Sequence, residues 1–185
     1  LKFGGSSVAS APCIQQVISI IKKLDSPFLI ITSAFQGATD QLIEIAQRAV
    51  NHQHLPHLKA FEQRHIEIGQ SLIPHANQAE IVLFIQRQCQ QIHQLCAAVS
   101  TLNELSDRSK AAIIQHGELL SSMILYRCCL DSGLNVNYLD SREFIKTKGA
   151  YLQGIVLQEQ TNKRIQQIDY KQSYIVPSFI ASNQE

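Results

Sequence analysis

A lysine followed by two glycines and two serines stands near the start of the chain, in the segment Lys2-Phe3-Gly4-Gly5-Ser6-Ser7. Glycines let the backbone approach a ligand and take positive φ, and the amides at a helix N-terminus bind anions. Lys2 would add a point charge for a phosphate group. The segment therefore predicts an anion site, and its alternative is a plain strand-to-helix turn.

A polar loop, Ser33 to Asp40, follows the apolar run Phe28 to Thr32. That run is typical of a central parallel strand buried on both faces. Open α/β sheets bind ligands where such strands end. The hydroxyls of Ser33 and Thr39 are therefore candidate ligand contacts, although an ordinary capped loop would also explain them.

A glycine interrupts a strongly helical stretch at His116-Gly117-Glu118. Glycine inside a helix costs about 1 kcal/mol relative to alanine, so close approach of a ligand or another backbone would explain it. Glu118 could then hold an amino group through a charge-assisted hydrogen bond. The alternative is a solvated glutamate beside a packing glycine, and we expect His116 to be structural.

Asp140-Ser141-Arg142 follows a short predicted strand, either as a capped turn or as a functional group. His52, His54 and His57 lie in a polar turn without an acidic or cysteine partner nearby, so we expect them at the surface and predict no metal site. The five cysteines fall mostly in apolar helical stretches and are predicted to act as small hydrophobes in a reducing cytosol.

Composition excludes several classes of function. The net charge is +1, basic residues are scattered, and tryptophan is absent, which argues against a nucleic-acid partner. No apolar run is long enough to span a membrane, so we expect no membrane partner and a cytoplasmic location. An apolar fraction of 45% indicates a globular domain with a sizeable core.

These segments are predicted to lie in an α/β, three-layer sandwich with a mostly parallel sheet and a helical insertion. We expect one lobe over residues 1–185, largely helical from 41 to 132. The expected strands are residues 1–3, 28–32, 136–139 and 174–176, with an extended segment at 151–156. The expected helices cover residues 8–23, 41–50, 58–72, 78–99, 107–130 and 161–168.

The ordered motifs together resemble the aspartate kinases of the amino acid kinase family. The opening KFGGSSVA is similar to that family's KFGG[TS]SVA. Ser33 to Asp40 resembles its SAxxGxTN loop, and HGELLS from His116 resembles HGELxS. Asp140 to Thr147 and Val176 to Asn183 resemble two further segments. Asp40 stands where that family usually has Asn, and Ser178 and Ala181 stand where glycines are common.

The resemblance implies roles for individual residues. Lys2 would be catalytic and would contact the transferring phosphoryl group, with Gly4, Gly5 and Ser6 close to the phosphates. A second set would bind the substrate, with Glu118 holding its amino group and Phe179 lying against it: Ser33, Thr39, Glu118 and Phe179. No metal ligand is implied within this chain.

The implied reaction transfers the γ-phosphoryl group of ATP to the β-carboxylate of L-aspartate and gives phosphoaspartate, an early step towards lysine, threonine and methionine. ATP and Mg²⁺ would bind chiefly to the other half of the domain. That half, its GRGGSD-type motif and the regulatory ACT domains are not found in these residues. We therefore expect a segment of a longer, homo-oligomeric parent, either monofunctional or fused, and no kinase activity from the segment alone.

Two alternatives remain at this point. The parent could be another amino acid kinase with a different acceptor, such as acetylglutamate, glutamate or a nucleoside monophosphate. The chain could instead be a non-catalytic module that binds aspartate or regulates another protein.

Overall fold

The computed structural model describes residues 1–25 and 27–183, so residues 26, 184 and 185 of the predicted lobe lie outside the description. A four-stranded sheet with the order β1-β2-β6-β3 forms its centre, and all its pairs are parallel. The strands are β1 (Lys2–Phe3), β2 (Leu29–Thr32), β3 (Asn137–Tyr138) and β6 (Tyr174–Pro177). Because the strands are parallel, the loops that follow them share one edge.

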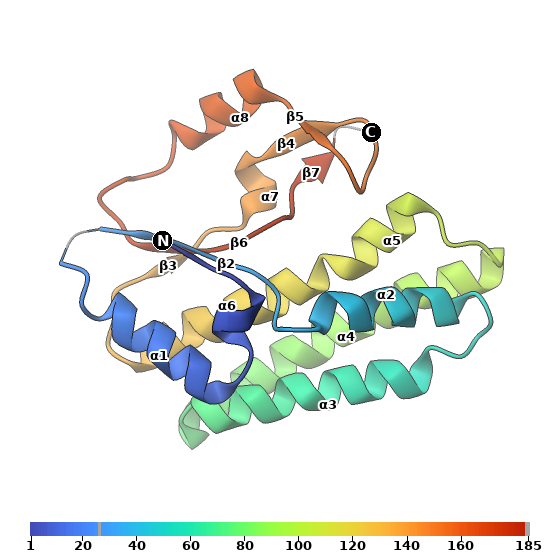
Figure 1. Ribbon diagram of the computed structural model, residues 1–185, viewed down its shortest axis with the longest axis horizontal. Helices are drawn as coiled ribbons and strands as arrows, with labels where there is room; N and C mark the ends of the chain where they lie inside the picture. Colours follow the sequence, from blue (N-terminus) through green and yellow to red (C-terminus); the bar gives the residue numbers. More distant parts are fainter. Residues whose placement is uncertain (26, 184–185) are drawn as a thin grey trace.

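Most helices lie together on one side of this sheet (Figure 1). They are α1 (Ala11–Ile21), α2 (Ala38–Ala49), α3 (Leu55–Leu72), α4 (Gln78–Leu102), α5 (Asp107–Ile114) and α6 (His116–Asp131), with 3-10 turns η1 (Gly5–Val8) and η2 (His75–Asn77). The two longest, α3 and α4, pack against each other and belong to the predicted helical insertion.

A small second sheet and two short helices lie on the other side (Figure 1). The order is β5-β4-β7, with α7 (Ser141–Phe144), β4 (Lys146–Lys148), β5 (Ile155–Val156), α8 (Gln158–Ile165) and β7 (Ser182–Asn183). Strand β7 was not predicted, because two polar residues carry no strand pattern. The predicted α/β architecture with a mostly parallel sheet is confirmed.

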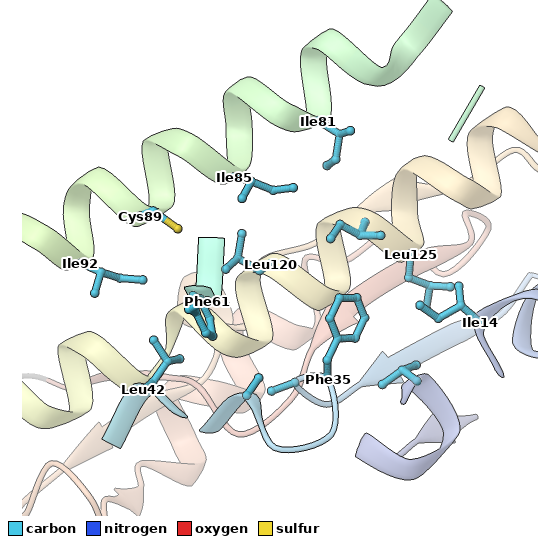
Figure 2. Close-up of a cluster of buried hydrophobic side chains, with 14 of the residues drawn as sticks. Ile14, Phe35, Leu42, Phe61, Ile81, Ile85, Cys89, Ile92, Leu120 and Leu125 are labelled. Atoms are coloured by element: carbon cyan, nitrogen blue, oxygen red, sulfur yellow. The ribbon is translucent and has the colours of Figure 1, made fainter. Parts of the chain in front are cut away.

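The core joins the helical layer to the sheet. Figure 2 shows Ile14 of α1, Phe35 of the loop after β2, Phe61 of α3, Ile85 of α4 and Leu120 of α6 in one cluster, and each is almost completely buried. Phe35 thus anchors the loop that carries Ser33, because removing this ring from water stabilises the loop against the helices.

The predicted helix 107–130 is wrong in one respect, since it is divided at Gln115 into α5 and α6. The side-chain amide of Gln115 donates to the carbonyl of Ala112 at 3.1 Å. In an uninterrupted helix that carbonyl would accept from the amide of His116, so the side chain competes with the helical ladder. The break lies directly before Gly117 and Glu118.

Two other expectations about burial are corrected. Leu29 is 43% exposed whereas Ile30 is fully buried, so β2 is covered well on only one face. His54 was expected at the surface but is 5% exposed, and its Nε2 lies 3.1 Å from Nδ1 of His93. His93 is far from His54 in the sequence, so no local sequence pattern could have predicted this pair of rings.

Two findings concern metals and membranes. Among residues 1–25 and 27–183, no three His, Cys, Asp or Glu side chains are grouped as metal ligands would be. Within the same ranges, none of the helices combines the length and the apolar character that crossing a bilayer requires.

Candidate functional site

Loops at the carboxyl edge of the parallel sheet border one pocket of about 910 Å³. The predicted site residues that line it come from four separate segments: Gly5, Ser6, Ser33, Thr39, Glu118 and Phe179. The remaining two, Lys2 and Gly4, lie beside it in β1 and the turn that follows. The pocket therefore occupies the position where open α/β sheets bind ligands.

In the glycine loop, the absence of a side chain matters for close packing and not for unusual backbone angles. Gly4 has φ −80°, so the expected use of positive φ is wrong. A Cβ on Gly5 would lie 3.3 Å from the carbonyl oxygen of Ala34, so Gly5 lets the two loops pack closely. The loop leads into the 3-10 turn η1, and the longer helix α1 begins only at Ala11.

Lys2 contacts Phe179, which lines the pocket. The Nζ atom of Lys2 lies 4.8 Å from the centroid of the Phe179 ring, within the range of a cation–π contact. Phe179 is 83% exposed and has φ 55°. An exposed aromatic residue in the left-handed region is strained, and such strain is concentrated at functional sites.

Ser33 and Thr39 approach the pocket from β2 and α2. The amide of Ser33 donates to the carbonyl of Phe3 at 3.1 Å, and its carbonyl accepts from the Ser121 hydroxyl at 2.8 Å. Thr39 lies in the first turn of α2, which begins after Gly37 at φ 75°. Both residues therefore line the pocket from backbone held by ordered elements.

Glu118 is 7% exposed and projects from the first turn of α6 into the same pocket. Burial raises the pKa of its carboxyl to about 7, although hydrogen bonds to the backbone of Glu118 itself and of Ala34 oppose the shift. Within the part of the chain that the structure describes, no cation forms an ion pair with it. A buried carboxylate of this kind is suited to a cationic ligand group.

Gly117 is required by the packing between α6 and the loop after β2. A Cβ there would lie 3.0 Å from Cβ of Ala34 and 3.3 Å from Cδ1 of Leu42. Gly117 is therefore a packing contact, as the alternative interpretation of the sequence expected. The same interpretation expected a solvated Glu118, and this part is wrong, because Glu118 is buried. Close packing also lets the carboxyl of Glu118 form a hydrogen bond with the backbone of Ala34.

Asp140 and Arg142 do not line the pocket themselves, but Arg142 contacts Gln115, which does. Asp140 caps α7 by accepting from the amide of Arg142 at 3.0 Å and also pairs with that guanidinium. Arg142 then donates through Nη1 to Oε1 of Gln115 at 3.0 Å.

His116 is buried, bonds to Gln88 at 2.8 Å, and has a pKa lowered to about 4 by burial, so it is neutral and structural.

Sequence reasoning missed several pocket residues. Arg108 and Tyr151 both line it, and Cζ of Arg108 lies 5.6 Å from the Tyr151 ring centroid. They belong to α5 and to the turn before β5, and neither stands in a motif. Ser121 and Ser178 were missed as partners of Ser33, because their hydrogen bonds join positions distant in sequence.

The pocket combines three chemical features. Lys2, which lies beside the pocket, and the loop of Gly5 and Ser6, which lines it, favour an anion such as a phosphoryl group. The hydroxyls of Ser33 and Thr39 are donors for a carboxylate. Glu118 offers a buried negative charge for an ammonium group. A small amino acid beside a phosphate would satisfy all three.

The model of the amino acid kinase family matches residues 1–185 of this chain. An aspartokinase of Chlamydia pneumoniae is 29% identical over 98% of this chain and 39% of its own length. A bifunctional aspartokinase/homoserine dehydrogenase of Buchnera aphidicola is 27% identical over 100% of this chain and 24% of its own length. The chain therefore spans well under half the length of these relatives.

Solved structures agree on the fold. Escherichia coli aspartokinase III in complex with lysine and aspartate superposes with a TM-score of 0.89 at 21% identity, covering 99% of this chain and 41% of that one. The same enzyme in complex with aspartate and ADP gives a TM-score of 0.86. At this identity the likeness concerns the fold alone.

Proposed function

Because this chain belongs to the amino acid kinase family, we propose that it is the acceptor-binding lobe of an aspartate kinase. The parent protein would transfer the γ-phosphoryl group of ATP to the β-carboxylate of L-aspartate. The observation that carries the proposal is Glu118, a buried carboxylate without an ion-pair partner among the described residues, in one pocket with Ser33 and Thr39. The aspartokinase names of the relatives support the choice of acceptor.

In this proposal Glu118 binds the α-ammonium group of aspartate. Its pKa of about 7 in the empty pocket would fall when the ammonium arrives, because an opposite charge favours the ionised carboxyl. Ser33 and Thr39 would donate to carboxylate oxygens and orient the acceptor. Phe179 would cover the substrate at the pocket mouth.

Lys2 has the catalytic role in the proposal. When bound, MgATP supplies the phosphoryl group, and its Mg²⁺ supplies most of the charge compensation that two anionic reactants need. Lys2, with the amides of Gly4, Gly5 and the neighbouring Ser6, would stabilise the charge that spreads over the phosphoryl oxygens. A carboxylate acceptor is deprotonated at neutral pH, so no general base is needed.

The described residues of this chain are better suited to bind a phosphate group of ATP than to bind Mg²⁺. Lys2 and the open space beside Gly4 leave room for an anion, since a Cβ on Gly4 would meet no atom within 4 Å. The described part of the chain offers no group of acidic side chains for Mg²⁺. We therefore propose that the metal and most of the nucleotide are held by residues beyond this lobe, in a homo-oligomeric parent.

The test is L-aspartate-dependent ADP formation by the full-length parent, measured beside a panel of acetylglutamate, glutamate and a nucleoside monophosphate. Turnover with L-aspartate alone supports the proposal. Turnover with another acceptor would replace it with a different amino acid kinase. Aspartate binding without any turnover would indicate a regulatory module instead.

A further inference from the structure

We propose that Ser178 is a positioning residue that fixes the hydroxyl of Ser33 as a hydrogen-bond donor to the carboxylate of the acceptor. The inference rests on the proposed function and adds to it a determinant of substrate selectivity. Its basis is a hydrogen bond in which the Ser178 hydroxyl donates to Oγ of Ser33 at 3.1 Å.

Ser33 is held on three sides before any ligand arrives. Its amide donates to Phe3 of β1, its carbonyl accepts from Ser121 of α6, and its hydroxyl accepts from Ser178 after β6. Three elements distant in sequence thus fix one small residue at the pocket wall. Of these three groups of Ser33, only the hydroxyl belongs to the side chain, and Ser33 lines the pocket.

Ser178 is itself firmly placed. Its amide donates to the carbonyl of Thr32 at 2.9 Å, which continues the pairing of β6 with β2. It is 6% exposed and does not line the pocket, in contrast to its neighbour Phe179. Ser178 can therefore influence a ligand only through the group it touches, which is Ser33.

Because Ser178 is the donor in this hydrogen bond, the bond does not use the proton of the Ser33 hydroxyl. A hydroxyl has one proton and two lone pairs, and Ser178 occupies one lone pair of Ser33. No residue in the described ranges accepts a hydrogen bond from the Ser33 hydroxyl, so its proton is available to the pocket. An oxygen of the acceptor can take this proton, whereas an N–H group would have to use the one lone pair that Ser178 leaves free.

This arrangement distinguishes a carboxylate from a carboxamide. Both oxygens of the side chain of L-aspartate accept hydrogen bonds, whereas L-asparagine carries a donor NH₂ at one of the two positions. Without Ser178 the Ser33 hydroxyl could rotate and accept from that NH₂. Loss of Ser178 should therefore weaken aspartate binding and reduce the preference for aspartate over asparagine.

The experiment uses the full-length parent and two variants that remove the same hydroxyl, Ser178→Ala and Ser178→Gly. We measure KM and kcat for L-aspartate and the inhibition constant of L-asparagine. Both variants should raise the KM about three- to tenfold with kcat within twofold, and lower the preference for aspartate by a similar factor. The control is Ser100→Ala, because Ser100 is a buried serine bonded to the carbonyl of Ala49.

A double-mutant cycle separates positioning from packing. If Ser178 acts through Ser33, adding Ser178→Ala to Ser33→Ala should change the KM no further. Additive effects, or an unchanged aspartate-to-asparagine preference in both folded single variants, would overturn the inference. A wild-type parent that turns over no aspartate would instead overturn the proposed function, so the two failures are distinguishable.

Discussion

The ammonium group of Lys2 lies 4.8 Å from the centre of the Phe179 ring, although the two residues come from opposite ends of the described chain. The contact joins the start of β1 to the segment after β6. It keeps the cation beside the pocket, against a ring that lines it. Phe179 maintains it from a strained backbone conformation, with φ 55°.

Replacing Lys2 by glutamine should abolish most phosphoryl transfer. Losing a cation that contacts the transferring group should lower kcat about 100-fold or more, with a smaller change in the KM for L-aspartate. Phe179→Leu should have an intermediate effect, since it removes the cation–π contact, worth about 0.5–1 kcal/mol at an exposed site, but keeps Lys2 and an apolar side chain beside the substrate. Steady-state kinetics of the full-length parent provide the measurement.

Lys23→Gln is the matched control for that prediction, because Lys23 is an exposed lysine just after α1, away from the pocket. It should leave kcat unchanged. If Lys2→Gln also kept a kcat within twofold of wild type, Lys2 would have no catalytic role.

Glu118 should make stability depend on pH. Its pKa is 4.5 in the unfolded chain and about 7 when folded, so the folded state binds the proton more tightly. The favourable contribution is complete below about pH 4.5 and is lost as the pH rises through 7. Relative to Glu118→Gln, wild type should therefore lose about 1–3 kcal/mol of unfolding free energy over this interval.

Urea unfolding of both proteins at pH 5 and pH 8.5 measures that difference. L-Aspartate should reduce it at pH 8.5, because the ammonium group compensates the buried carboxylate. Equal pH dependence of the two proteins would mean that the carboxyl of Glu118 is solvated.

Gly117→Ala should disturb the site although alanine favours helices. The new Cβ would lie 3.0 Å from that of Ala34, and overpacking costs about 1–3 kcal/mol, which exceeds the gain in helix propensity of about 1 kcal/mol. Moving the loop would displace Ser33, so the KM for L-aspartate should rise severalfold. Differential scanning calorimetry and kinetics measure the two effects.

Gly69→Ala in α3 is the control for this substitution. Its Cβ would meet Ile85 and Ile81 at 3.6 and 3.7 Å, which are ordinary contacts. That variant should be as stable as wild type or up to about 1 kcal/mol more stable. If Gly117→Ala behaved in the same way, close packing would not explain the glycine.

The sequence was most informative where chemistry and local geometry coincide. A polar loop after an apolar strand predicted Ser33, and glycines between a strand and a helix predicted the anion loop; both border one pocket because parallel strands end at one edge. The fold class followed from the same alternation of strands and helices. A glycine inside a helix drew attention to Glu118 as a ligand contact, whereas the structure explains Gly117 by packing against the side chains of Ala34 and Leu42.

The remaining features depend on contacts between distant residues. The bond from Ser178 to Ser33 and the pair of Arg108 with Tyr151 have no local pattern. The positive φ of Phe179 could not be read from its residue type, because aromatic residues rarely adopt it. The helix break at Gln115 coincides with a hydrogen bond from its side chain to Ala112, and that side chain could equally have faced solvent.

The most direct test compares L-aspartate with succinate, which lacks only the ammonium group, as acceptors for wild type and Glu118→Gln. Wild type should prefer L-aspartate in kcat/KM by about 100-fold, since the ammonium would pair with a buried carboxylate. Glu118→Gln should lose most of this preference. An equally strong preference in the folded variant would show that Glu118 does not bind the ammonium group and would contradict the account.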